Sequence, residues 1–202
     1  NPNNGTWDNL GGGVSFGGFG GEVRAFAVSG SDVYVGGSFS QAGGASGFNN
    51  VARYDGSGWS RLGTLAQNGV NSQVNALAVD GQGRVYVGGF FTTAASGAVP
   101  ANRVARYNPN SGTWDDLGGG VTSSGGGFTA VYALAVSGND VYVGGFFSQA
   151  GGATGFNSVA RYNPNSGTWD NLGGGVSFGG SGGVVYALAV SGNDVYVGGS
   201  FN

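Results

Sequence analysis

The sequence contains no cysteine, histidine, methionine, lysine or isoleucine. Without histidine or cysteine it cannot form a Ser–His pair, a thiolate nucleophile or a conventional zinc or copper site. Glu22 is the only glutamate, and the neighbours Asp115 and Asp116 would point to opposite faces of a strand, so paired catalytic carboxylates are not expected. We therefore predict that the protein is not an enzyme and has no catalytic residues, no metal and no cofactor.

Charged residues are also scarce: they make up 8% of the chain, and the formal net charge is −3. Seven arginines without any lysine give no cluster of cations to neutralise phosphates, so no nucleic-acid partner is expected. No apolar stretch approaches the roughly 18 residues of a membrane span, so no membrane insertion is expected. A weakly charged, lysine-free chain rich in glycine, serine and asparagine favours an extracellular or cell-surface location.

Glycine and aromatic residues are abundant, and they recur with a fixed period. The hexapeptide Asp-Val-Tyr-Val-Gly-Gly stands at residues 32–37, 140–145 and 194–199, and with one change at 84–89. The four tryptophans of the chain are 52, 55 and 55 residues apart. A chain that is 40% hydrophobic, with aromatic residues at fixed repeat positions, is too apolar to be a disordered glycine-rich segment.

Each repeat contains four short runs of β-branched and aromatic residues, bounded by glycine, asparagine, serine or proline. Residues 131–136, 140–145, 159–162 and 112–117 are examples of the first, second, third and fourth run. Such runs predict strands, and four antiparallel strands repeated every 50 residues or so are typical of a β-propeller blade. The predicted fold is all-β: propeller blades of four antiparallel strands in about four repeats, with a ring that is incomplete within this chain.

The spacing of the marker residues resembles that of the kelch repeat. Gly144 and Gly145 follow Val-Tyr-Val, then come Arg161 and Tyr162, and Trp169 follows this tyrosine by seven positions. The resemblance covers the whole chain, and it implies that the diglycine closes the second strand while the tyrosine and tryptophan belong to the third and fourth. The second repeat departs from the pattern, because its tryptophan follows its tyrosine by only five positions.

We predict a single repeat domain, residues 1–202, with repeats at about 1–54, 55–107, 108–162 and a truncated 163–202. The third run occurs three times and the other runs four times, which gives 15 strands. The chain can therefore be a piece of a longer propeller, one of two chains that complete a ring of about eight blades, or an open array. Exposed strand edges can pair with further chains, so self-association is expected.

Two sets of residues that mark the repeats, the tryptophans and the paired glycines, are predicted to be structural. Large rings at fixed strand positions are typical of packing between blades. The markers are Trp7, Trp59, Trp114, Trp169, Gly36, Gly37, Gly88, Gly89, Gly144, Gly145, Gly198 and Gly199. Arg53, Arg106 and Arg161 lie on the third run, and we expect each to pair with Asp32, Asp140 or an aspartate that follows a tryptophan (Asp8, Asp116 or Asp170), or to stack on an aromatic ring. The alternative is that they bind a carboxylate or an acidic sugar.

The two long connections of each repeat should emerge on the same face of the propeller. They are rich in glycine and serine and carry the phenylalanines Phe16, Phe19, Phe48, Phe128, Phe156 and Phe178. Loops on a rigid scaffold are common binding sites, so these residues are candidate contacts for a partner. The alternative is that the rings fold back over the blades as plugs.

Two hypotheses on function follow from the sequence. In the first, near-identical repeats form a non-enzymatic extracellular structural protein that assembles, for example into a fibre or surface layer. In the second, the chain is a carbohydrate- or protein-binding propeller that uses the phenylalanine-bearing loops on one face.

Overall fold

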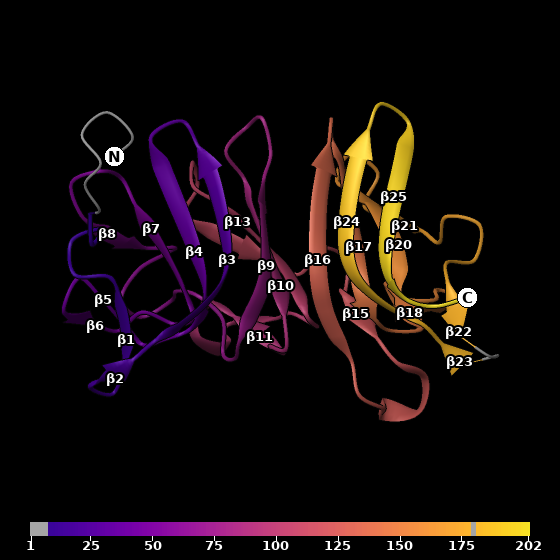
Figure 1. Cartoon of the computed structure of the whole chain (residues 1–202), viewed down its shortest axis with the longest axis horizontal. Coiled ribbons are helices and arrows are strands. Elements are labelled where there is room, and N and C mark those ends of the chain that lie inside the picture. The colour runs from indigo at the N-terminus through magenta and orange to yellow at the C-terminus, as the bar shows by residue number, and fades with distance from the viewer. Residues whose placement is uncertain (1–7, 179–180) are drawn as a thin grey trace.

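The computed structural model describes residues 8–178 and 181–202 and shows a row of small antiparallel sheets (Figure 1). Four sheets have four strands each, and in three of them the strands follow the spatial order first, second, third, fourth of a repeat. This order, with every neighbour antiparallel, confirms the prediction of propeller blades. The row does not close into a ring: the first and fourth blades lie at opposite ends of it.

The strands of the blades follow the predicted runs closely. The first blade contains β3 (Glu22–Ser29), β4 (Asp32–Ser38), β7 (Val51–Tyr54) and β8 (Trp59–Arg61). The second contains β9 (Val74–Val79), β10 (Val85–Gly89), β13 (Val104–Asn108) and β14 (Thr113–Asp115). The third contains β16 (Ala130–Ser137), β17 (Asp140–Phe146), β20 (Val159–Asn163) and β21 (Thr168–Asp170). The fourth contains β24 (Val184–Ser191) and β25 (Asp194–Ser200), and within the described residues these two strands pair only with each other.

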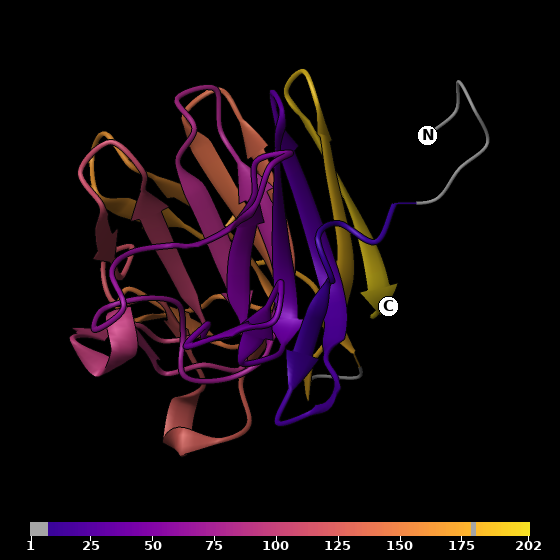
Figure 2. The same cartoon turned by 90° about the vertical axis from the view of Figure 1, so that its left-hand side faces the viewer.

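Short strands form a second layer below the blades, where the sequence indicated long glycine-rich connections. They are β1 (Val14–Phe16), β2 (Phe19–Gly20), β5 (Gln41–Ala42), β6 (Ala45–Ser46), β11 (Thr93–Ala94), β12 (Val99–Pro100), β15 (Val121–Thr122), β18 (Gln149–Ala150), β19 (Ala153–Thr154), β22 (Ser177–Phe178) and β23 (Ser181–Gly182). Two 3-10 turns, η1 (Ala95–Gly97) and η2 (Ser124–Gly126), lie among them. The two long connections of one repeat pair with each other, β1 with β5 and β15 with β18. Both views show this layer opposite the hairpin turns of the blades (Figures 1 and 2).

The second glycine of each diglycine is required within its own blade. A Cβ atom on Gly145 would lie 2.0 Å from the carbonyl oxygen of Ala130, on the neighbouring first strand. The close approach comes from a β-bulge, since the register shifts between Val131 and Ala133 opposite the diglycine. Gly37, Gly89 and Gly199 occupy the same position against their own first strands.

The first glycine of each diglycine lies instead at the joint between two blades. A Cβ atom on Gly144 would lie 2.5 Å from Cγ1 of Val185 and 3.1 Å from Cδ1 of Leu188, both in the fourth blade. The missing side chain is therefore a notch that accepts a valine and a leucine from the next first strand. The same joint pairs Gly36 with Val74 and Leu77, and Gly88 with Val131 and Leu134.

Tryptophans of the fourth strands add a hydrogen bond to each joint. The indole Nε1 atoms of Trp59, Trp114 and Trp169 donate to the carbonyl oxygens of Leu10, Leu62 and Leu117, at 2.6, 2.9 and 3.0 Å. Each leucine ends the fourth-strand run of the preceding repeat, so the bond connects successive repeats. Trp7 lies outside the described residues, and residues 8–10 of the first predicted fourth run form no strand.

The hydrophobic core is divided among the joints. One cluster joins the first and second blades and includes Tyr34, Val74 and Leu77. A second joins the second and third blades and includes Tyr86 and Val131. Each joint thus buries the tyrosine side of one blade against the valine side of the next.

Candidate functional site

Arginines of the third strands lie beside aspartates, as the sequence suggested. Arg53 contacts Asp32 through two atom pairs, with Nε 2.7 Å from Oδ2 and Nη2 2.8 Å from Oδ1. The hydrogen bond to Asp32 raises the pKa of Arg53. Arg161 lies 3.1 Å from Asp170 and 3.7 Å from Asp140. These pairs hold adjacent strands of one blade together.

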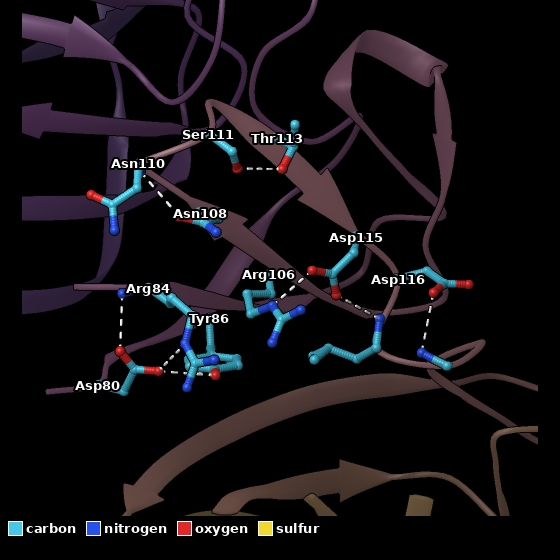
Figure 3. A network of polar contacts seen from close by, with 12 residues as sticks. Asp80, Arg84, Tyr86, Arg106, Asn108, Asn110, Ser111, Thr113, Asp115 and Asp116 are labelled. Atoms are coloured by element: carbon cyan, nitrogen blue, oxygen red, sulfur yellow. Dashed lines mark hydrogen bonds and ion pairs between the residues drawn. The ribbon is translucent and has the colours of Figure 1, made fainter. Parts of the chain in front are cut away.

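The second blade reverses the usual arrangement, because an arginine replaces the hexapeptide aspartate. Asp80, in the preceding turn, supplies the carboxylate: Arg84 Nε donates to Asp80 Oδ2 at 2.6 Å, and the hydroxyl of Tyr86 donates to the same oxygen at 3.1 Å (Figure 3). Burial alone would raise the pKa of Asp80, but hydrogen bonds from Arg84 and Gln82 outweigh it and lower the pKa. Burial, together with the charge of Asp80, raises the pKa of Tyr86 to about 12.

Arg106 differs from the prediction in its partner. Its Nε donates to Asp115 Oδ2 at 2.7 Å, whereas Asp116 accepts the backbone N–H of Gly118 at 3.1 Å (Figure 3). Asp115 and Arg106 are register partners on β13 and β14, which brings their side chains to the same face of the sheet. Asp116 follows the strand and caps the turn instead.

A polar cleft of about 320 Å³ with charged residues in its walls lies between the first two blades. Its lining includes Asp32, Arg53, Tyr107 and Asn110. Asp32 and Arg53 are paired with each other, and Arg61, the third charged residue of the lining, donates to the backbone carbonyl oxygens of Gly47 and Ser46. The charged groups of this cleft already have partners within the protein. We therefore interpret the cleft as part of the joint between two blades, with polar walls, and not as a reactive site.

The six candidate phenylalanines divide into two groups. Phe16, Phe19, Phe128 and Phe178 are exposed. Phe48 and Phe156 are buried, which corrects the prediction that they contact a partner. Phe48 packs in the core cluster of the first blade with Arg61 4.7 Å above its ring, and Phe156 packs in the second interblade cluster, so both rings act as plugs.

Phe128 belongs to a row of aromatic rings that the sequence analysis did not identify. Neighbouring rings in the order Phe146, Phe128, Phe90, Tyr132 and Tyr186 have centroids 6.1, 5.7, 5.9 and 5.4 Å apart. The row crosses from the loop layer to the first strands of the third and fourth blades, and Phe128 and Tyr186 are exposed. A signal was present in the sequence, because the first and fourth repeats carry Ser38 and Ser200 in place of Phe90 and Phe146.

The row of blades has two end faces, and these expose opposite sides of the interblade joint. On the first blade, Phe26 is 61% exposed and Val28 is also exposed. On the fourth, Tyr196 is 58% exposed, whereas its counterpart Tyr34 is 3% exposed. An apolar hollow lies on each end face: one of about 160 Å³ beside Val23 and Phe26, and one of about 290 Å³ beside Tyr196 and Gly198. The lining of the second hollow comprises Ala187, Leu188, Ala189, Tyr196, Val197 and Gly198.

Within residues 8–178 and 181–202, no three acidic side chains gather as a metal site would require. In the same part of the chain, no helix has the length and apolar character needed to span a bilayer. Arg53, Arg84, Arg106 and Arg161 pair with aspartates of their own blade, and the large hydrophobic side chains that are exposed are aromatic or aliphatic. The arrangement is suited to contacts with other molecules.

Comparisons with known proteins agree with the fold. The family described as a domain of unknown function (DUF5122) β-propeller matches residues 83–115. A comparison with curated proteins finds no match. The match and the solved structures described next support a β-propeller without singling out the kelch type.

Three solved structures are similar at low sequence identity. The extracellular domain of a hybrid two-component system from B. thetaiotaomicron has a TM-score of 0.56 and 17% identity over 88% of this chain and 20% of its own. The computationally designed Ika4 protein has a TM-score of 0.53 and 19% identity over 96% and 93%. YCF48 bound to D1 peptide has a TM-score of 0.50 and 13% identity over 91% and 50%. The chain thus spans a fifth of the bacterial extracellular domain, and these likenesses concern the fold alone.

Proposed function

We propose that this chain is a non-enzymatic structural protein: a scaffold of kelch-like propeller blades that joins with further blades outside the cell. One observation carries the proposal. The chain makes the same apolar joint three times, and its two ends expose the two unlike sides of that joint. A module built in this way is suited to serial assembly.

The use of the charged residues supports a structural role. Arg53, Arg84, Arg106 and Arg161 each lie in an ion pair with an aspartate of the same blade. Such pairs fix the strands of a blade but leave little charge available for a reaction. Exposed surface at both ends is apolar instead, as expected of a protein that buries it against a partner.

The extracellular location is part of the same proposal. A similar fold occurs in the extracellular domain of the bacterial two-component system, and the composition of this chain is lysine-free and weakly charged. Chains of this composition fit an environment outside the cell. Antibody labelling of intact and permeabilised cells tests the location, and a signal only after permeabilisation would contradict it.

Sedimentation velocity over a wide concentration range tests the assembly. The 19.9 kDa chain should form larger particles as its concentration rises, because burial of the two end faces is favourable. A monomer at every concentration would overturn the proposed assembly. Electron microscopy of the same samples distinguishes closed particles from fibres.

The aromatic row supports a second candidate function, the binding of carbohydrate or protein. Exposed rings such as Phe128 and Tyr186 can stack on sugars or fill pockets of a partner. A glycan array, read with the wild-type chain and with Phe128→Ala, tests this alternative. Retention that is lost in the variant supports a binding module, and no retention on any glycan would overturn carbohydrate binding by this surface.

A further inference from the structure

We propose that the exposed face of the fourth blade docks on the exposed face of the first blade of a second copy, head to tail. The contact would be a fourth joint of the kind that the chain forms three times internally. The inference rests on the proposed scaffold function and names its partner and its interface residues.

The fourth blade presents an empty notch. At the three internal joints, the first glycine of the diglycine leaves space that valine and leucine side chains of the next blade enter. Gly198 has the same position in the repeat, but a Cβ atom there would meet only Ala187, at 3.6 Å. The notch is therefore formed, and no described residue of the chain fills it.

The first blade presents the side chains that fit such a notch. Val23 stands where Val185 stands in the fourth blade, and Phe26 stands where Leu188 stands. At the third joint those two residues approach Gly144. By the same geometry, Val23 and Phe26 of a second copy would approach Gly198, and the 61% exposed ring of Phe26 would be buried.

The surroundings of the notch are complementary as well. At the third joint, the bulged residues of adjacent first strands, Tyr132 and Tyr186, have ring centroids 5.4 Å apart. The corresponding neighbours at the new joint would be Tyr186 and Arg24 of the second copy. A guanidinium over a tyrosine ring is a favourable pair, and Arg24 is already oriented by Glu22, with 2.7 Å between their charged groups.

The two faces are unlike, so the contact is heterologous. They lie at opposite ends of the row (Figure 1), and each molecule can therefore bind one copy at each end. Heterologous contacts either close into a ring or continue as a filament. Both outcomes use the same joint, and the particle mass distinguishes them.

Two substitutions test the joint from its two sides. Gly198→Val fills the notch with a side chain that has room in the isolated chain, and Phe26→Asp places a charge on the opposite face. Each should raise the dissociation constant of assembly by about 30-fold or more, the size of a hot-spot effect. Sedimentation velocity measures this constant, and circular dichroism checks that each variant keeps the wild-type strand spectrum.

Mixing the two variants provides a sharper test. Gly198→Val keeps an intact first-blade face, and Phe26→Asp keeps an intact notch, so an equimolar mixture should form a 1:1 complex and nothing larger. Phe128→Asp is the matched control, since Phe128 is 60% exposed but packs against Phe90 and Phe146, which belong to the second and third blades rather than to either end blade. This control should assemble like the wild type.

The outcomes separate the inference from the proposed function. If the wild-type chain assembles but Gly198→Val and Phe26→Asp assemble equally well, the head-to-tail joint is wrong and the scaffold function stands. If the wild-type chain stays monomeric, the scaffold function fails and the joint with it. If the mixed variants stay monomeric while the wild type assembles, the pairing of these two faces is wrong.

Discussion

The third and fourth blades carry nearly the same sequence in their first two strands, yet their surfaces differ. Gly144 lies against Val185 and Leu188 of the next blade, whereas Gly198 faces none of the described residues beyond its own blade. Gly145 and Gly199, in contrast, are equally enclosed by their own first strands. The comparison shows that the two glycines of the repeat have separate roles: the first serves the joint, and the second serves the bulge.

The largest expected effect comes from the tyrosine that each joint buries. Tyr34→Ala should lower the free energy of unfolding by about 3–5 kcal/mol, because it leaves a cavity in the first interblade cluster. Tyr196→Ala, at the exposed counterpart, should change it by less than about 0.5 kcal/mol. Urea titrations below the concentration of assembly measure both, and equal losses would show that the fourth blade is covered in solution.

A substitution at the first glycine extends the comparison. Gly144→Val should destabilise the chain by about 1–3 kcal/mol, since its side chain overlaps Val185. Gly198→Val should have an effect within about 0.5 kcal/mol. The midpoint of urea unfolding gives both values. A strongly destabilising Gly198→Val would mean that some part of the chain occupies the notch.

A carboxylate of the second blade should contribute more to stability than one of the fourth blade. Asp80→Asn should cost about 1–3 kcal/mol, because the substitution weakens the bonds to Arg84 and Tyr86. Asp194 is exposed and forms no ion pair with any residue in 8–178 or 181–202, so Asp194→Asn should be nearly silent. Chemical denaturation at pH 7 measures the difference.

The pH dependence follows from the lowered pKa of Asp80. Because folding lowers this pKa, the stabilisation is present above the pKa of an unfolded aspartate and is lost as the pH falls through the folded pKa. Wild-type stability should therefore decrease in acid more steeply than that of Asp80→Asn. Parallel curves for the two proteins between pH 5 and pH 2, measured by urea unfolding, would contradict the role of Asp80.

The smallest effect is expected from the indole hydrogen bond. Trp169→Phe keeps most of the ring but removes the bond from Nε1 to the carbonyl oxygen of Leu117, at a cost of about 1 kcal/mol. The variant lacks this hydrogen bond, as does the fourth blade, which has no fourth strand within the described residues. Thermal unfolding followed by circular dichroism measures it, and an unchanged midpoint would show that water replaces the bond.

The sequence predicted the blades well because their period is regular and most of their strands are four to eight residues long. It could not predict the two-residue strands below the blades, such as β5 and β18, since two residues show no periodicity. The sequence also could not show whether a loop residue is buried or exposed. Phe48 and Phe16 have similar glycine-rich neighbours, and only the packing of the connections shows that one is buried and the other exposed.

The candidate site was predicted in part. The pairing of Arg53 with Asp32 followed from the repeat, but the pairing of Arg106 with Asp115 depended on the strand register, which tryptophan spacing does not give. The aromatic row was missed because its five rings come from two connections and three strands. Its members depart from the repeat, and such departures are a better guide to a surface than the repeated residues are.

The uniform valine–glycine fit between blades has a consequence for the history of the chain. Since each unit presents the same pair of surfaces, a gene recombination that adds or deletes one whole unit leaves every remaining contact chemically unchanged. We expect length variants of this protein to differ by whole multiples of about 54 residues rather than by partial segments.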